Sequence, residues 1–225
     1  MNRFLRGVVR AMVESFDLPG PILEIGSYQI AGQEELVDLR GLFPGREYTG
    51  VDFRPGPGVD LVANVETLPL PSASVGTVLA FNVFEHVKRF WKGFEEAARV
   101  LRPDGVFLIS TPFYFHLHAY PHDYWRFTPE AFDSLLEQFP TRVLGWHGPA
   151  RRPLNVWAAA FGEKAKVPSE EQLAKYRRLL AEHAKEPAGW VQEIRYRIGR
   201  LLCGRRPFAP HLDREKWETE VRRAA

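Results

Sequence analysis

The 225-residue chain has almost no cysteine, since Cys203 stands alone. A single cysteine excludes an intrachain disulfide, a thiolate zinc cluster and a CxxC redox pair, and it fits a reducing compartment. The chain also lacks an apolar run of roughly 18 residues, the length that spans a bilayer. Its N-terminal stretch is interrupted by Arg6, Arg10 and Glu14 before a signal-peptide core can form. We therefore expect a soluble, unprocessed, cytoplasmic protein.

A large excess of charge of one sign is missing as well, because the formal net charge is only +2. The balance hides an asymmetry. Residues 1–150 carry 13 Lys and Arg against 18 Asp and Glu, whereas residues 151–225 carry 17 against 10. A basic tail suits an anionic partner, yet charged helices are more often solvated faces. We therefore do not expect a nucleic-acid partner, although a nucleic-acid role for the tail stays open.

Short apolar runs alternate with helical patterns through the middle of the chain. Strands are expected at 21–25, 47–53, 75–82, 105–110, 142–146 and 155–161, and helices at 32–43, 90–101 and 129–139. Thr128 and Pro129 form a strong start signal for the last of these helices. Alternation of strand and helix predicts an α/β fold with a mostly parallel sheet flanked by helices.

Three regions follow from the patterning. Residues 1–20 hold an amphipathic N-terminal helix, residues 21–162 form the α/β core, and residues 163–225 form a basic helical extension. Within the extension, Ser169 and Gln172 form a capping box, a second helix is expected at 188–202, and a short third helix is expected from Asp213. The apolar faces of the terminal helices suit either a monomer or a homodimer.

The first strand-to-helix turn is the place where open α/β sheets bind ligands. Here Gly26 follows an apolar strand, which permits a sharp turn and a helix N-terminus beyond it. Tyr28 stands where the GxGxxG pattern has its second glycine, and this argues against a dinucleotide-dependent oxidoreductase. Asp52 ends the second strand, where a carboxylate accepts both hydroxyl protons of a ribose.

Five motifs occur in order over about residues 20–112. They are Ile22-Leu-Glu-Ile-Gly26, Tyr48-Thr-Gly-Val-Asp52, Ala63-Asn-Val-Glu-Thr-Leu-Pro-Leu70, Asn82-Val-Phe-Glu-His86 and Val100-Leu-Arg-Pro-Asp-Gly105. In order and spacing they resemble the class I S-adenosylmethionine-dependent methyltransferases. The resemblance implies a Rossmann-like, mostly parallel seven-stranded sheet, S-adenosylmethionine as cofactor and S-adenosylhomocysteine as product.

The resemblance also implies a cofactor site. Glu24 and Gly26 would face the methionine part, Asp52 the ribose, Asn64 and Val65 the adenine edge, and Asn82 the methionine amino group. Their neighbours Ser27, Tyr28, Phe53 and Glu66 complete the expected set. Two positions depart from the family pattern, because Tyr28 replaces a glycine and Asn64 replaces an aspartate. The amide oxygen of asparagine still accepts a hydrogen bond from the adenine amino group.

The segment after the fifth strand, residues 110–128, holds seven of the 29 aromatic residues and three of the seven histidines. Loops rarely concentrate aromatics unless they line a site. Its YPHDYWRFTPEAF stretch resembles a bacterial methyltransferase subgroup often associated with cell-surface glycans or secondary metabolites. The candidate catalytic residues are His122, Asp123, His86 and His116, and the candidate acceptor-binding residues are Tyr114, His118, Tyr124, Trp125 and Arg126.

The histidines have several possible roles. His122 with Asp123 is the first candidate for a general base, because a carboxylate keeps an imidazole in a proton-accepting tautomer. Each histidine could instead bond a backbone carbonyl, and Trp125 and Arg126 could pack the loop against the sheet. His116, His118, His122 and Asp123 have the chemistry of zinc or iron ligands, but the aromatic neighbours and the resemblance favour a metal-free site.

The sequence thus predicts a cytoplasmic methyltransferase acting on a small-molecule or glycan-like acceptor, with oxygen favoured over nitrogen as the methylated atom. Two alternatives remain open. One is a catalytically degenerate methyltransferase fold that serves as a binding or assembly module, and the other is a nucleic-acid methyltransferase that uses the basic tail.

Overall fold

The structure is a computed structural model, and it describes residues 3–118, 121–183, 194, 198, 201 and 217–224. The strands are β1 (Ile22–Ile25), β2 (Tyr48–Asp52), β3 (Leu61–Val62), β4 (Val75–Phe81), β5 (Leu101–Pro112), β6 (Thr141–His147), β7 (Asn155–Phe161) and β8 (Trp217–Arg223). The helices are α1 (Arg3–Ser15), α2 (Glu34–Val37), α3 (Phe90–Val100), α4 (Pro129–Leu135) and α5 (Glu170–His183), with 3₁₀ turns η1 (Arg40–Leu42) and η2 (Phe84–His86).

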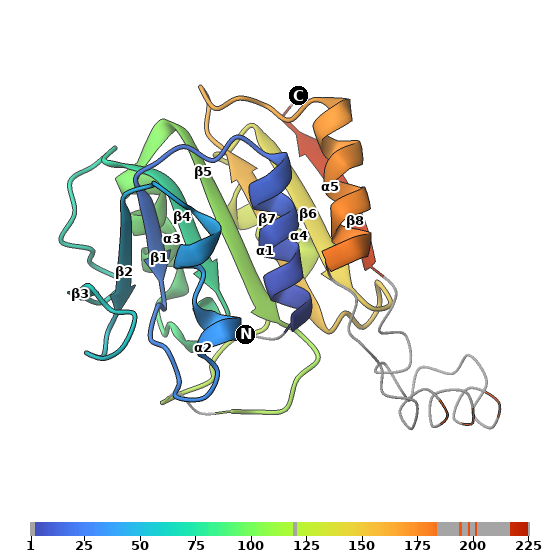
Figure 1. The fold of residues 1–225 in the computed structure, drawn as a ribbon, viewed down its shortest axis with the longest axis horizontal. Coiled ribbons are helices and arrows are strands. Elements are labelled where there is room, and N and C mark those ends of the chain that lie inside the picture. Colours follow the sequence, from blue (N-terminus) through green and yellow to red (C-terminus); the bar gives the residue numbers. More distant parts are fainter. Residues whose placement is uncertain are drawn as a thin grey trace.

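The strands form one sheet in the order β3-β2-β1-β4-β5-β7-β6-β8. The five strands from β3 to β5 pair in parallel, whereas β7, β6 and β8 are antiparallel to their neighbours. Helices cover both faces of this sheet, which gives three layers (Figure 1). The expected mostly parallel α/β sheet is confirmed, and its parallel part places the carboxyl ends of these five strands at one edge.

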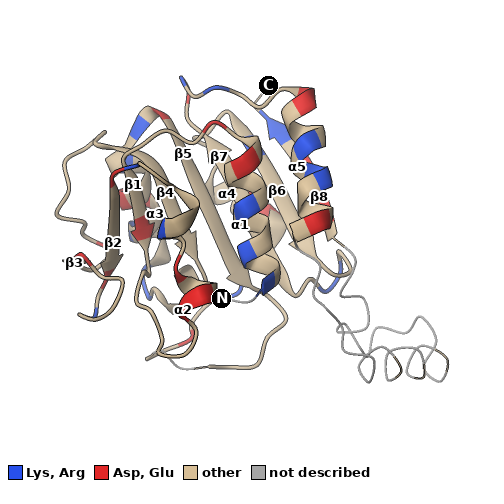
Figure 2. Ribbon diagram, in the orientation of Figure 1, with Lys and Arg blue, Asp and Glu red and all other residues tan. Residues whose placement is uncertain are grey.

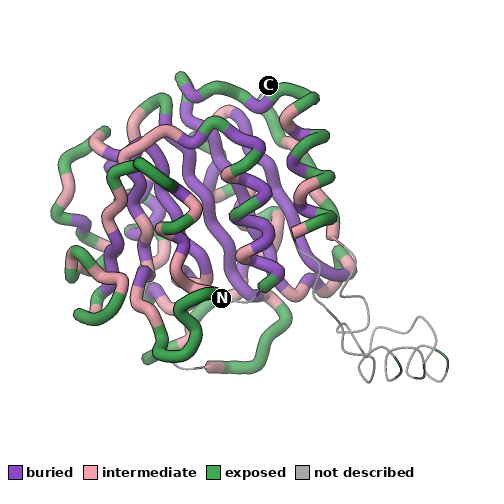
Figure 3. The backbone as a smooth tube through the Cα atoms, in the orientation of Figure 1, coloured by how far each residue is buried: buried purple, intermediate pink, exposed green. Residues whose placement is uncertain are grey.

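One face of the sheet packs against α3 and α4. Phe94 and Ala97 of α3 and Phe132 of α4 lie in one buried cluster with inward-facing strand residues such as Ile25, Val78 and Phe107. Figure 3 shows the central strands buried along most of their length. Because β4 is covered on both faces, all seven of its residues are buried, and this explains its continuous apolar sequence.

The opposite face packs against α1 and α5, which lie side by side in front of the sheet (Figure 1). The apolar stripe of α1 enters a second buried cluster, together with Leu173, Tyr176 and Leu180 of α5. Trp157 Nε1 in β7 donates a 2.9 Å hydrogen bond to the hydroxyl of Tyr176. The start of the expected basic extension is therefore part of the main body.

Charge on α5 is mixed rather than uniformly basic. Figure 2 shows acidic and basic residues interspersed along this helix. Lys175 donates to the backbone oxygen of Glu14, and Arg223 of β8 forms a 3.3 Å ion pair with Glu170. The capping box is confirmed, because Ser169 N donates to Gln172 Oε1 at 3.0 Å and Gln172 N donates to Ser169 Oγ at 3.2 Å.

The C-terminal segment corrects the prediction. The sheet has eight strands rather than seven, and residues 217–223 form β8, where we expected a short helix from Asp213. In the Trp-Glu-Thr-Glu-Val sequence, Trp217 and Val221 alternate with charged residues and pack against the second core cluster. This period of two fits a strand with one buried face. The expected helix at 188–202 lies largely outside the described residues.

Two other segments differ from expectation. The helix expected at 32–43 is only the single turn α2 followed by η1, and the two-residue strand β3 was not predicted. The helix expected at 129–139 ends at Leu135, although Thr128 caps it as predicted by accepting from Ala131 N at 3.0 Å. Within the described residues, no helix combines the length and the apolar composition needed to cross a membrane.

Replacing Tyr176 with phenylalanine tests how α5 is held to the sheet. We expect Tyr176→Phe to lower the free energy of unfolding by about 1–3 kcal/mol, because Trp157 Nε1 is then left buried without an acceptor. Urea denaturation measures this change. Phe115→Leu, at an exposed loop position, is the control and should leave the midpoint unchanged. An unchanged urea midpoint in Tyr176→Phe would show that the hydrogen bond between Trp157 and Tyr176 contributes nothing to the free energy of unfolding.

Candidate functional site

One cavity of about 870 Å³ opens at the carboxyl ends of the parallel strands. Most of the expected site residues line it: Glu24, Gly26, Tyr28, Asp52, Phe53, Asn64, Val65, Glu66 and Asn82 from the cofactor set, and His86, His116, His122, Tyr114, His118 and Tyr124 from the acceptor set. Parallel strands bring these residues together because their carboxyl ends share one edge of the sheet. Ser27, Asp123, Trp125 and Arg126 are outside the lining among the described residues.

The turn after β1 begins at Gly26, which has a φ of +81°. A side chain there would be strained by this backbone conformation and would collide with Val83, which follows Asn82 in the turn after β4. The glycine therefore lets the two turns approach closely. Ser27, which we expected near the cofactor, is turned away from the cavity and buried against Gly50.

Glu24 lies in the strand just before this turn and lines the cavity. The hydroxyl of Tyr48 donates a 2.7 Å hydrogen bond to Glu24 Oε2. Burial raises the pKa of Glu24 to about 7, although the bond from Tyr48 acts in the opposite direction. Glu24 is thus a carboxyl group that changes protonation near neutral pH at the inner wall of the cavity.

Tyr28, the residue that departs from the glycine pattern, is held at the side of the cavity. Its ring packs so closely on Gly56 that a side chain at Gly56 would overlap it. The guanidinium of Arg54 lies 4.3 Å from the centre of the same ring, which is a cation–π contact. The neighbouring loop therefore accommodates the bulky residue, and Tyr28 forms part of the wall.

Asp52 ends β2 and is 8% exposed. Its Oδ1 accepts a 3.0 Å hydrogen bond from Arg54 N and lies 3.5 Å from Arg54 Nε. Within the described ranges, the polar contacts of its carboxylate fall on Oδ1. The other oxygen, Oδ2, remains able to accept hydrogen bonds from a ligand in the cavity.

The next wall comes from the segment after β3. Asn64 Oδ1 accepts from Glu66 N at 2.9 Å and so fixes a tight turn. The Glu66 carboxylate accepts from the guanidinium of Arg89 at 2.7 Å and pairs with its second nitrogen at 2.6 Å. Asn82 has a φ of +57° and accepts from Ser110 Oγ at 3.4 Å. These bonds position three expected cofactor residues at one rim.

The loop after β5 docks on η2. The backbone oxygen of Glu85 accepts hydrogen bonds from Tyr124 N at 2.7 Å and from Trp125 N at 3.2 Å. Trp125 Nε1 donates to the backbone oxygen of Val87 at 3.1 Å, and its ring packs edge-on against Phe90 at 5.0 Å. Trp125 therefore fixes the loop, which is the packing role that the sequence left open.

We expected Asp123 to pair with His122, but the structure pairs it with other residues. Its carboxylate pairs with Arg126 through a 2.8 Å bond and lies 3.0 Å from His118 Nδ1. The Arg126 guanidinium holds the pKa of Asp123 well below its usual range, so the carboxyl stays ionised. The backbone oxygen of His122 instead accepts from His86 Nδ1 at 2.6 Å.

Among the residues at or near the cavity that the sequence did not predict, His147 and Glu85 bear most on its chemistry. His147, at the end of β6, lines the cavity and stacks on Phe4 of α1 with ring centres 3.8 Å apart. Glu85 lies in the Asn82–His86 motif but was not selected, because the sequence does not show that its carboxyl is fully buried. The available signal was its position in this motif, between Asn82 and His86, which were both selected as site residues.

Comparisons with known proteins agree with this geometry. Residues 33–109 match a family model described as a methyltransferase domain. A probable S-adenosylmethionine-dependent methyltransferase of Mycolicibacterium smegmatis is 48% identical over 65 residues, which cover 29% of this chain and 23% of the relative. A similar Mycobacterium tuberculosis protein is 48% identical over 50 residues and 18% of its length. The chain thus aligns with less than a quarter of these relatives.

Solved structures share the fold of this chain over more than the residues that the family model matches. Burkholderia thailandensis 1,6-didemethyltoxoflavin-N1-methyltransferase, solved with S-adenosylhomocysteine bound, aligns with a TM-score of 0.53 and 18% identity over 71% of this chain and 78% of that chain. A putative methyltransferase in complex with the Haloferax volcanii Trm112 activator aligns with a TM-score of 0.50 and 14% identity over 71% and 90%. These likenesses show a Rossmann-like α/β fold that the chain shares with solved methyltransferase structures.

The raised pKa of Glu24 predicts a pH-dependent stability. Between its ordinary value of 4.5 and about 7, the unfolded chain has lost a proton that the folded chain keeps, so stability falls as pH rises. Glu24→Gln removes this contribution. We expect the stability of the natural protein relative to Glu24→Gln to decrease from about pH 5 to about pH 8, as measured by urea midpoints.

Glu95→Gln, which removes an exposed carboxylate on α3, is the matched control for this experiment. Its difference from the natural protein should be the same at both pH values. A Glu24→Gln difference that does not change with pH would contradict the assignment of a raised pKa to Glu24.

Proposed function

We propose that this chain is an S-adenosylmethionine-dependent methyltransferase that methylates an oxygen or nitrogen atom of a small-molecule or glycan-like acceptor. The proposal rests mainly on one observation: a single cavity is lined both by the ends of β1, β2 and β4 and by the histidine- and aromatic-rich loop after β5. In-line displacement needs the methyl donor and the acceptor in one enclosure, and positioning alone is worth about 7–11 kcal/mol.

The residues present fit the cofactor. A drug-sized ligand occupies a pocket of roughly 300–1,000 Å³, so a cavity of about 870 Å³ has room for the cofactor beside a small acceptor. Asp52 Oδ2 would accept from the ribose hydroxyls. Asn64 Oδ1 keeps a second lone pair for the adenine amino group, while Glu24, Gly26 and Asn82 would surround the methionine end. Tyr28 and Phe53 would add apolar wall.

When bound, S-adenosylmethionine supplies a methyl group on a positively charged sulfur. The acceptor gives its proton to a base and forms a bond from its lone pair to the methyl carbon. The carbon–sulfur bond breaks, and its electron pair stays on sulfur. His122 and His116 both line the cavity and are the candidates to take the proton. His86 Nε2 instead lies 3.7 Å from Glu85 Oε1, so we do not choose His86 as the base.

The acceptor side favours a flat or partly apolar molecule. Tyr114 and Tyr124 line the cavity and are 43% and 40% exposed, so their rings remain available for stacking. Arg152 lies 3.7 Å from the centre of the Tyr114 ring. These features suit a sugar ring or an aromatic metabolite with a hydroxyl group. We place the reaction in the cytoplasm because the single cysteine fits a reducing compartment, and we propose a monomer or homodimer.

Removing the carboxylate of Asp52 tests the cofactor assignment. Asp52→Ala should weaken binding of S-adenosylhomocysteine by about 10- to 150-fold, because hydrogen bonds to a charged group contribute about 1.5–3 kcal/mol. Calorimetric titration measures both affinities. Asp17→Ala, which removes an exposed carboxylate paired with Lys166, is the control and should bind normally.

If folded Asp52→Ala binds S-adenosylhomocysteine as tightly as the natural protein does, the placement of the ribose at Asp52 is overturned. No binding of S-adenosylmethionine or S-adenosylhomocysteine to the natural protein would favour the binding-module alternative instead.

A further inference from the structure

Glu85 is a buried carboxyl group behind His86, which lines the cavity. Its side chain is 0% exposed, and neither carboxyl oxygen makes a hydrogen bond within residues 3–118, 121–183 and 217–224. A buried carboxylate is costly unless a proton or a cation compensates it. The backbone oxygen of Glu85 also accepts the hydrogen bonds that hold the loop after β5, so this residue contributes to the structure of the site.

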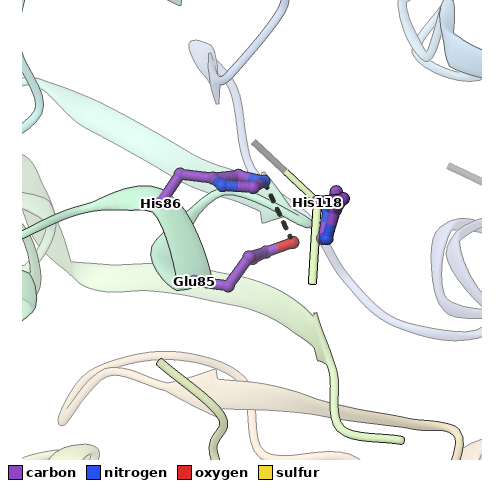
Figure 4. Close-up of side chains that lie close together, drawn as sticks. All are labelled: Glu85, His86 and His118. Atoms are coloured by element: carbon purple, nitrogen blue, oxygen red, sulfur yellow. Dashed lines mark ion pairs between the residues drawn. The ribbon is translucent and has the colours of Figure 1, made fainter. Parts of the chain in front are cut away.

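His86 presents a ring nitrogen to this carboxyl group. Its Nδ1 lies 2.6 Å from the backbone oxygen of His122. A carbonyl oxygen only accepts hydrogen bonds, so Nδ1 carries the proton and Nε2 of the neutral ring has a lone pair. Nε2 lies 3.7 Å from Glu85 Oε1, and Figure 4 marks this pair with a dashed line.

His118 comes to the same place from the loop after β5. Its Nδ1 lies 3.0 Å from Asp123 Oδ2, and Arg126 Nη2 donates a 2.8 Å hydrogen bond to the same oxygen. An ionised carboxylate beside Nδ1 favours the tautomer with the proton on Nδ1, which leaves Nε2 as a donor of electrons. Figure 4 shows the His118 ring beside the carboxyl oxygen of Glu85.

The three side chains form a compact set of ligand atoms. One ring nitrogen from each of His86 and His118 and one carboxyl oxygen of Glu85 all lie within 4.8 Å of one another. A proton shared directly between Glu85 and His86 would need a shorter separation than 3.7 Å. Two ligand atoms that each lie about 2.0–2.2 Å from one metal ion are separated by about the 3.7 Å that lies between His86 Nε2 and Glu85 Oε1.

We propose that Glu85, His86 and His118 bind a divalent transition-metal ion at the wall of the cavity. Two imidazoles and one carboxylate are a donor set that suits zinc, iron or manganese and leaves positions open for another ligand. The backbone carbonyl behind His86 and the carboxylate behind His118 are the outer partners that such ligands usually have. This set replaces the His116, His118, His122 and Asp123 combination considered from the sequence.

The metal also narrows the acceptor class, an inference that rests on the proposed methyl transfer. Because His86 and His118 line the cavity, an acceptor hydroxyl could occupy an open position on the ion. A metal ion lowers the pKa of a bound hydroxyl. The proton would pass to His122 or to water, the oxygen would bond to the methyl carbon, and the electron pair of the broken carbon–sulfur bond would stay on sulfur. The acceptor atom is therefore an oxygen.

The test is calorimetric titration of the chelator-treated full chain with zinc alone and, separately, with manganese alone. We expect one ion per chain for at least one metal. Binding should weaken at least tenfold in Glu85→Gln and in His118→Ala. His183→Asn, which alters a histidine of α5 that lies 3.3 Å from Glu14 and outside the cavity lining, is the control and should bind like the natural protein. Saturating metal should raise Tm in the natural protein and in His183→Asn.

The absence of one-to-one binding with both metals would overturn the site, and so would unchanged binding in both ligand variants. If Glu85→Gln fails to fold, His118→Ala, with its side chain 19% exposed on the loop, decides the question alone. S-Adenosylhomocysteine binding is measured on the same samples. Cofactor binding without metal binding overturns only the metal site. Metal binding without cofactor binding supports the site and overturns its role in methyl transfer.

Discussion

The close approach of two turns shapes the site, and it depends on the absence of a side chain at Gly26. Gly26 N donates to the backbone oxygen of Val51 at 2.7 Å, and the glycine lets Val83 pack directly above it. Parallel pairing of β1 with both β2 and β4 holds the strand ends level. The turns after β1 and β4 therefore face a common space, and the residues that follow each turn become walls of one cavity.

The second half of the cavity depends on Glu85. Its backbone oxygen receives two hydrogen bonds from the loop after β5, while its side chain lies buried beside His86 and His118. Asp123 and Arg126, which the sequence suggested as parts of an acceptor site, form an ion pair that supports His118. The loop thus has an outer layer that fixes it and an inner layer that faces the cavity.

The features that depend on one local property of the sequence, such as an apolar run or a helix cap, were predicted well. The strand expected at 155–161 has the bounds of β7, because its apolar run is covered on both faces. The capping signals at Thr128 and Ser169 operate as expected, since they depend only on neighbours along the chain. Residues 32–43 failed as a helix although their spacing is helical. The chain there must instead follow the cavity rim, and only residues 34–37 complete a turn of α-helix.

The sequence by itself determined the α/β class, the positions of most strands along the chain and the segments that line the cavity. These follow from hydrophobic periodicity, glycine placement and motif order, all of which are local. Only the tertiary structure decided that Asp123 pairs with His118 and Arg126 rather than His122, that Glu85 is fully buried, and that residues 217–223 add an eighth strand. Each of these depends on contacts between residues distant in sequence or on the direction of a side chain, and neither is encoded in spacing along the chain.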